Sequence, residues 1–292
     1  MASGTIKKII RNLVPDRLWS GLRRRRILRR HAYVAQLCEQ LAEAYEAHPE
    51  PYDAIPKQPL TDGRTIWQYW AQGWDHVPAV VAECMASVDR FAGDYRVVRL
   101  CDANLEMYID LPDSIRAMRY RMTTAHFSDL LRLMLLKTYG GLWLDATVMM
   151  SGPVPPEMAS ADFFVYRRDP SESNQDFWEH TYAYYFDWHP DFKVRMLSSI
   201  MAAHRGTPLV SAMCDLSLYW WRIYDFQPDY FLMQILFEVL VNGRMRDLQP
   251  PVVSDCLPHC LQQVMQRPDA LPLTREEILA RTPFHKLTYK YE

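Results

Sequence analysis

The sequence contains no hydrophobic run long enough to cross a bilayer. A transmembrane helix needs about 20 consecutive apolar residues, and every apolar stretch in the 292 residues is interrupted sooner by Lys, Arg, Asp or Pro. The first thirty residues also lack the continuous apolar segment of a secretory signal peptide. We therefore expect a soluble or peripheral cytoplasmic protein whose six cysteines are reduced thiols.

Motifs of several other protein classes are missing too. No glycine-rich loop of a kinase or dinucleotide enzyme is present. The run Cys256–Cys260 includes His259 but has no second ligand pair at zinc-site spacing, which favours a plain loop over a zinc site. No nucleic-acid-binding motif follows the basic run Arg23–Arg26, so we expect no nucleic-acid partner. Aromatic residues, by contrast, make up 13% of the chain, which suits sugar recognition as well as an ordinary core.

The net charge of −2 hides a strong asymmetry. Residues 1–30 carry ten basic residues against one acid, so this segment has a charge of +9 and the remaining 262 residues a charge of −11. Aliphatic residues alternate with these charges, a pattern typical of a helix lying in an anionic membrane surface. We predict a basic amphipathic helical extension over residues 1–50 that binds such a surface through residues 1–30. The alternative is a solvated helix that packs on its own domain.

The body of the chain alternates between strand and helix patterns. The expected elements in order are a helix over 33–47, a strand over 65–70, a helix over 78–90, a strand over 95–100, a short helix over 103–109, a helix over 125–138 capped by Thr123 and ended by Gly140 and Gly141, and a strand over 142–148. This alternation predicts an α/β core with a largely parallel sheet. The second half is expected to be mainly helical and irregular.

Polar residues gather around the last of these strands. Asp145 lies at the end of a buried strand, where ligands of open α/β sheets collect and where a charge is costly unless it is balanced. Asp129 and Arg132, on the preceding helix, are three residues apart and share a face. The pattern indicates a polar ligand site that can include a divalent metal. The alternative is a structural Asp129–Arg132 ion pair beside a capping Asp145.

A resemblance sharpens this interpretation. The run from Ala125 to Thr147, with its Ser-Asp-Leu-Leu-Arg, Tyr-Gly-Gly and Trp-x-Asp-Ala-Thr segments, resembles the signature of the capsular polysaccharide synthesis protein family. That family is similar to DXD-containing sugar transferases related to Golgi mannosyltransferases. Thr65–Trp74 resembles its first strand and donor loop, and Phe284–Lys290 resembles its C-terminal element. The resemblance implies a GT-A type nucleotide-sugar-binding α/β domain over residues 51–292, with mainly helical C-terminal insertions.

The resemblance also implies roles for individual residues. The implied nucleotide-sugar-binding residues are Trp67, Gln68, Gly73, Asp129, Arg132, Asp145, Lys286 and Lys290. Asp145 matches the first acid of the DXD motif, and the implied ligands of Mn²⁺ or Mg²⁺ are Asp145, Thr147 and His285. A full DXD motif has an acid where this chain has Thr147, which weakens the case for a metal more than the case for a donor.

Asp145 and Asp129 are the implied catalytic carboxylates, and a third candidate lies in the second half. Asp229 precedes an expected helix over 231–241 and is placed to orient or deprotonate an acceptor hydroxyl. The alternative is that Asp229 only caps this helix.

The expected function is therefore a bacterial-type glycosyltransferase that moves a sugar from a nucleotide-sugar donor, UDP-linked and with retention, to a glycan or glycolipid. The acceptor is expected to be a surface polysaccharide, a lipopolysaccharide or a lipid-linked glycan at the inner face of the cytoplasmic membrane. Two alternatives stay open. One is a non-catalytic member of a polysaccharide assembly, suggested by Thr147, and the other is a sugar-phosphate transferase.

Overall fold

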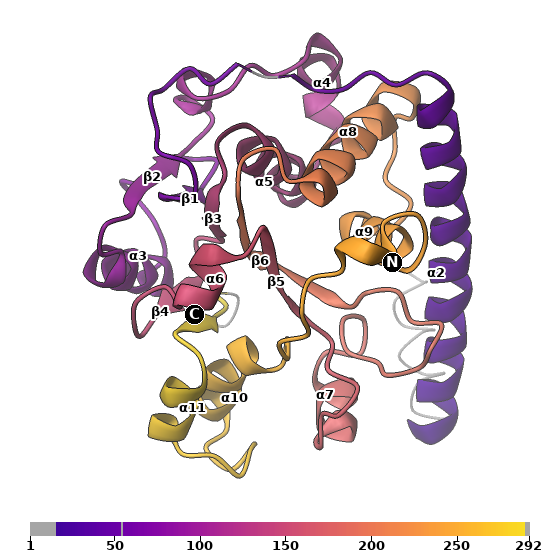
Figure 1. Ribbon diagram of the computed structural model, residues 1–292. Helices are drawn as coiled ribbons and strands as arrows, with labels where there is room; N and C mark the ends of the chain where they lie inside the picture. The colour runs from indigo at the N-terminus through magenta and orange to yellow at the C-terminus, as the bar shows by residue number, and fades with distance from the viewer. Residues whose placement is uncertain (1–15, 54, 290–292) are drawn as a thin grey trace, which may run out of the picture.

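A mixed five-stranded sheet forms the centre of the computed structural model, which describes residues 16–53 and 55–289 (Figure 1). The strand order is β2-β1-β3-β6-β5, and β4 pairs with β7 in a second, two-stranded sheet. The strands are β1 (Thr65–Tyr69), β2 (Arg96–Leu100), β3 (Gly141–Leu144), β4 (Val148–Met150), β5 (Phe163–Arg167), β6 (Met196–Ala203) and β7 (Phe284–Lys286). The helices are α2 (Asp16–Ala47), α3 (Ala79–Phe91), α4 (Asp113–Met118), α5 (Thr124–Tyr139), α6 (Pro156–Ser160), α7 (Gln175–Thr181), α8 (Pro208–Ile223), α9 (Leu232–Asn242), α10 (Cys260–Gln266) and α11 (Arg275–Arg281).

The directions of the strands correct one expectation. β1 pairs in parallel with β2 and β3, as predicted, but β6 runs antiparallel to both β3 and β5. The prediction of a largely parallel sheet is therefore wrong for its second half, and β5 and β6 lie in a region expected to be mainly helical and irregular. Both strands are buried on nearly every residue. A strand covered on both faces has no alternation of apolar and polar residues, so its pattern resembles that of a buried helix.

The two faces of the sheet carry separate hydrophobic cores. Successive side chains of a strand point to opposite faces, so Trp67 and Trp143 join a large core with residues of α2, α5, α8 and α9. Ile66 and Leu142, one position earlier on each strand, join a smaller core that includes residues of α3, α6 and β4. The helices named for the first core cover one face, and α3 and α6 lie towards the other (Figure 1).

The junction between α5 and β3 shows why the sequence has two consecutive glycines. Thr123 caps α5 through its side chain, and Gly140 ends the helix at a φ of 68°, as predicted. Gly141 has a φ of 105°, and a Cβ atom there would lie 2.3 Å from the carbonyl oxygen of Thr65 on β1. Only glycine allows both this backbone conformation and this close approach. The two glycines thus bring β3 against β1 and fix where β3 begins.

Residues 16–47 form one continuous helix, α2, rather than two segments. α2 runs along one side of the molecule beside α8 and α9 (Figure 1), and Ile27, His31 and Val34 are buried against the domain. The described part of the extension therefore matches the alternative of a helix that packs on its own domain, while residues 1–15 lie outside the described residues. Leu18 and Leu22 stay exposed.

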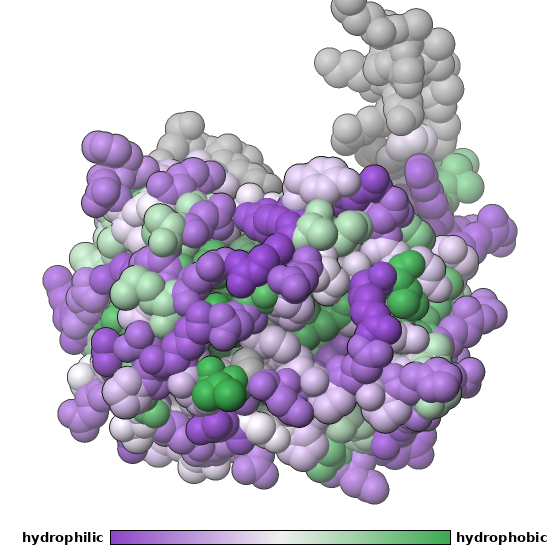
Figure 2. Space-filling model, turned by 90° about the horizontal axis from the view of Figure 1, so that it is seen from above, coloured by the Kyte–Doolittle hydropathy of each residue, from purple (hydrophilic) through white to green (hydrophobic). Residues whose placement is uncertain are grey.

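The described surface offers no membrane-spanning element. Among residues 16–53 and 55–289, no helix combines the length and apolarity needed to cross a bilayer. The face in Figure 2 is mostly hydrophilic, with hydrophobic residues scattered over it rather than gathered into one patch. Association of residues 1–30 with a membrane surface stays a prediction.

Candidate functional site

A cavity of about 590 Å³ opens where β1 and β3 end, at the edge of the sheet where the sequence predicts a ligand. Most of its wall comes from residues 69–72 at the end of β1, residues 145–147 after β3, the first half of α5, the start of β6 and residues 230–234 at the start of α9. Tyr182, Tyr185 and His259 line it as well. Lys286 and Tyr289 close it from the C-terminal segment. Segments far apart in the sequence thus converge at one point.

Asp145 contacts three side chains in and around this cavity. Its Oδ1 accepts hydrogen bonds from Trp143 Nε1 at 2.9 Å and from Arg132 at 3.3 Å. Its Oδ2 accepts one from Lys286 Nζ at 3.0 Å. Burial raises the pKa of Asp145, but the Lys286 and Arg132 cations outweigh this effect, and the net pKa lies below its ordinary value. Asp145 is therefore an ionised carboxylate at neutral pH.

Arg132 links the two carboxylates that the sequence singles out. Its side chain is 4% exposed, and its guanidinium lies 2.8 Å from Asp129 and donates to the Ser198 carbonyl at 2.9 Å. The predicted Asp129–Arg132 ion pair is thus present, and it forms part of the cavity wall rather than lying apart from it. Burial raises the pKa of Asp129 to about 6, because the nearby Asp145 charge adds to desolvation and Arg132 offsets only part of it.

Lys286 occupies the space between Asp145 and the threonine that replaces the second acid of the DXD motif. β7 pairs with β4 so that Lys286 lies opposite Val148. From this register, Lys286 Nζ reaches Thr147 Oγ1 at 2.6 Å and Asp145 Oδ2 at 3.0 Å. A fixed ammonium group therefore lies where a DXD motif would direct a cation.

The residues expected to bind a metal do not come together. His285 is fully buried on the other side of β7, where its Nε2 pairs with Ser151 Oγ at 2.8 Å and burial lowers its pKa to about 4. Asp145 is already bonded by Trp143 and by two cations. Within the described ranges, no cluster of three His, Cys, Asp or Glu residues is arranged to hold a metal ion. The structure therefore does not bring His285 to Asp145 and Thr147, and a divalent cation at this site stays a prediction.

The predicted residues of β1 need a similar correction. Trp67 is buried in the large core and donates through Nε1 to the Gly140 carbonyl at 2.9 Å, while Gln68 is buried and accepts from Arg99 at 3.1 Å. Neither side chain lines the cavity. The four residues that do line it, 69–72, follow directly. Gly73 makes the turn after them, with its N–H bonded to Trp70. Lys290 lies outside the described residues.

Asp229 also lies elsewhere than expected. Its side chain accepts the backbone N–H of Phe231 at 2.9 Å and forms an ion pair with Arg30 of α2 at 2.6 Å. It does not line the cavity that holds Asp145. The alternative that Asp229 caps α9 does not hold either, because the helix begins after Phe231 without a side-chain cap. Asp229 holds the turn before α9, away from Asp145, and a catalytic role for it stays a prediction.

Several residues of the wall were missed by the sequence analysis. Gln234 on α9 donates to Ser198 Oγ at 3.0 Å, and its Oε1 is buried with no partner among the described residues. Tyr230, beside Asp229, faces His126 with ring centroids 5.6 Å apart. The ring of Tyr289 meets that of Trp70 edge to face at 5.6 Å. A glutamine inside a strongly apolar helix was the one signal that pointed to this wall.

The six cysteines were expected to be reduced thiols. All six are unpaired, and burial raises the pKa of Cys260 to about 12. His259, which lines the cavity, is buried with its pKa lowered to about 3, and it lies among aromatic rings. The loop around Cys256 is thus packed among buried side chains.

Comparisons with known proteins bear on what this cavity does. The chain is 28% identical over 123 residues to the O-glycosyltransferase PaGT of Phomopsis amygdali, a match that covers 38% of this chain and 28% of that protein. It is 25% identical over 171 residues to the O-glycosyltransferase braB of Annulohypoxylon truncatum, covering 55% of this chain and 38% of that protein. The chain thus spans well under half the length of either relative.

A solved structure is also similar, although loosely. The PaToxG glycosyltransferase superposes with a TM-score of 0.37 at 12% identity, over 87% of this chain and 93% of that chain. The model of the capsular polysaccharide synthesis protein family, in contrast, matches residues 20–292. This match includes α5, Asp145 and the β7 segment that carries Lys286. The chain belongs to the capsular polysaccharide synthesis protein family.

Proposed function

We propose that this protein is a glycosyltransferase that takes a hexose from a nucleotide-sugar donor. One observation carries the proposal, namely the pair of cations around Asp145. Lys286 and Arg132 both contact this carboxylate inside a cavity at the carboxyl ends of β1 and β3. In a member of this family, an accessible lysine beside a buried arginine in such a cavity is suited to bind the diphosphate of a nucleotide sugar.

Lys286 and Arg132 have different parts in the proposed reaction. When the sugar leaves, the bond between its anomeric carbon and a phosphate oxygen breaks, and negative charge gathers on the diphosphate. Lys286 has the more accessible charge, with 24% of its side chain exposed, and it stabilises the leaving group. Arg132 is 4% exposed and keeps Asp129 and Asp145 in place, so it orients the wall that faces the sugar.

The remaining wall residues offer contacts for the rest of the donor. Trp70 and Tyr289 form an aromatic pair at the end of β1, on which a nucleobase can pack. Asp145 and the free Oε1 of Gln234 accept hydrogen bonds from ribose or sugar hydroxyls. Tyr230 borders the same space and is suited to contact the acceptor. These roles extend the proposal without involving a metal ion.

The finer parts of the function rest on the family resemblance. We propose a UDP-linked donor, retention of the anomeric configuration, and an acceptor that is a surface polysaccharide, a lipopolysaccharide or a lipid-linked glycan. We also propose that the protein works at the inner face of the cytoplasmic membrane, with the basic residues of the N-terminal 30 facing the lipid. NMR spectroscopy of the product tests retention directly.

A ligand panel tests the central proposal. Thermal unfolding of the full chain is measured with UDP-, GDP-, CMP- and dTDP-sugars, each with and without Mn²⁺. A ligand well above its dissociation constant stabilises by about 3 kcal/mol, so one nucleotide class should raise the midpoint, and the nucleoside diphosphate should be released when acceptor is added. No shift with any donor in folded protein would instead support a non-catalytic member of a polysaccharide assembly.

A further inference from the structure

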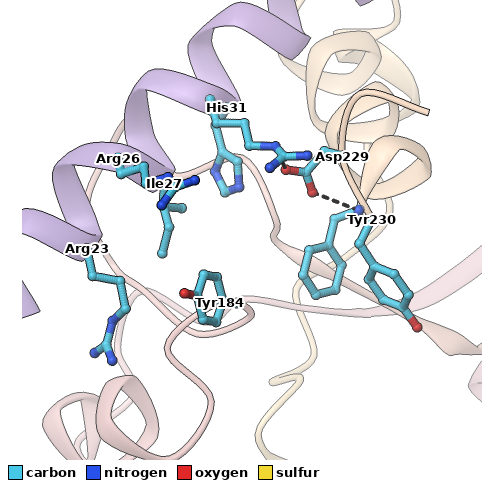
Figure 3. Close-up of a pocket in the computed structure, with 9 residues that line it drawn as sticks. Arg23, Arg26, Ile27, His31, Tyr184, Asp229 and Tyr230 are labelled. Carbon is cyan, nitrogen blue, oxygen red and sulfur yellow. Dashed lines mark hydrogen bonds and ion pairs between the residues drawn. The ribbon is translucent and has the colours of Figure 1, made fainter. Parts of the chain in front are cut away.

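A second cavity lies between α2 and the segment that precedes α9. Its volume is about 500 Å³, and α2 supplies most of its wall (Figure 3). Arg23, Arg26 and His31 extend from α2 towards Tyr184 and the segment of Asp229 on the opposite side (Figure 3). The helical spacing of three and four residues explains why arginines at 23, 26 and 30 share this face.

The charges in this cavity are not balanced. Arg30 is paired with Asp229 at 2.6 Å and bonded to the Pro228 carbonyl, so these two charges cancel. Arg23 and Arg26 have no ion pair with any described residue. His31 adds no charge at neutral pH, because burial lowers its pKa to about 4. Two guanidinium groups are therefore left to bind a ligand.

The neighbouring arginine of α2 makes the contrast clear. Arg24 forms ion pairs with Asp187 at 2.6 Å and with Glu179, so its charge is used inside the protein. Arg25 and Arg29 are exposed and do not line the cavity. Only Arg23 and Arg26 combine an unpaired charge with a position in the cavity wall.

This second cavity adjoins the one that holds Asp145. Tyr230 and Phe231 line both of them. Tyr230 lines the same cavity as Asp129 and Asp145, and its ring lies 5.6 Å from that of His126 on α5. In Figure 3 the Tyr230 hydroxyl points away from α2. The two cavities therefore meet at one aromatic pair, Tyr230 and Phe231.

We propose that the cavity of α2 binds a phosphate group of the acceptor, so that the attached glycan extends past Tyr230 to the donor. The proposal rests on the function proposed above. Guanidinium groups bind phosphate oxygens through paired, charge-assisted hydrogen bonds. Ile27, Tyr184 and Phe231 supply an apolar wall beside the charges, which suits a phosphate ester that carries a hydrocarbon or a sugar rather than a free ion.

The test compares two pairs of arginines on the same helix. Inorganic pyrophosphate is titrated calorimetrically into the wild type, an Arg23→Gln/Arg26→Gln variant and an Arg25→Gln/Arg29→Gln control of equal net charge. We expect one binding event to weaken at least about tenfold in the first variant and to stay within about twofold in the control. Equal weakening in both variants, or no binding to the wild type, overturns the proposal.

Two further measurements separate the sources of the phosphate and the two proposals. Sedimentation with phosphatidylglycerol or phosphatidylcholine vesicles shows whether a lipid phosphate reaches the cavity. If it does, pyrophosphate competes with the anionic vesicles, and the cavity variant binds them more weakly than the control. If the phosphate instead comes from a soluble ester, the cavity variant and the control variant should bind the vesicles equally. The rise in thermal midpoint that a nucleotide sugar causes should be the same in the cavity variant as in the wild type. If no nucleotide sugar raises the midpoint of the wild type, that result contradicts the proposed function but not the phosphate site.

Discussion

Replacing Lys286 with methionine removes the ammonium group that contacts Asp145 and Thr147 and keeps most of the aliphatic stem. A unit charge about 4 Å from a phosphate contributes about 4 kcal/mol at an effective dielectric constant of 20. Since about a quarter of the Lys286 side chain is exposed, we reduce this to about 3 kcal/mol. The variant should therefore lose about 10²-fold in kcat, a loss of the size seen when one oxyanion-stabilising donor is removed.

The matched control is Lys57→Met. Lys57 also pairs with an aspartate, Asp110, and its side chain is 32% exposed, but it lies outside the cavity. Initial rates of nucleoside diphosphate release are compared for both variants and the wild type, with thermal midpoints as a check on folding. The control should keep its kcat. A Lys286→Met enzyme within about threefold of the wild type would refute the assigned role of this cation.

Three other predictions follow from the same site and fold. Treatment with EDTA should leave turnover nearly unchanged, because Asp145 is already bonded to Arg132 and Lys286. A loss of activity that added Mn²⁺ restores would contradict this prediction. Donor affinity should rise by about tenfold as the pH falls through the Asp129 pKa of about 6, because protonation of Asp129 removes a charge that repels the diphosphate. The affinity is measured calorimetrically with a nucleotide sugar whose diphosphate keeps the same charge over this pH range. The Asp129→Asn variant should lose this pH dependence. Gly141→Ala should lower the free energy of unfolding, measured by chemical denaturation, by about 3 kcal/mol or more, because its Cβ would meet Thr65. Gly73→Ala should lower it less, because Gly73 has a φ of 94° but open space around it. Equal losses in the two variants would show that the close approach at Gly141 is unimportant.

Much of the first half of the fold could be predicted from local patterns. The cap at Thr123, the end of α5 at Gly140 and the position of Asp145 after a buried strand all depend on residues close in sequence. These features rest on helix capping, glycine conformation and strand length, which a sequence displays directly. The parallel pairing of β1 with β2 and β3 follows from the same alternation of strands and helices.

The C-terminal contribution to the site could not be predicted in the same way. β7 has only three residues, and its side chains alternate between two faces, so either His285 or Lys286 was able to face Asp145. The pairing of Lys286 with Val148 decides in favour of the lysine, and that register is a tertiary fact. The direction of β6, which brings Ser198 to the cavity, likewise depends on a long connection that no local pattern specifies.

The pairing of β4 with β7 also affects when the site becomes able to bind an anion. Thr147 and Lys286 are 139 residues apart, so the hydrogen bond between them closes a long loop. Until β7 docks, Asp129 and Asp145 share only the charge of Arg132, and this edge of the sheet repels a diphosphate. A chain that has folded its sheet but not its last strand is therefore unable to hold the donor. On the proposed function, donor binding and the docking of β7 are thermodynamically linked, and we expect a bound nucleotide sugar to stabilise the C-terminal strand.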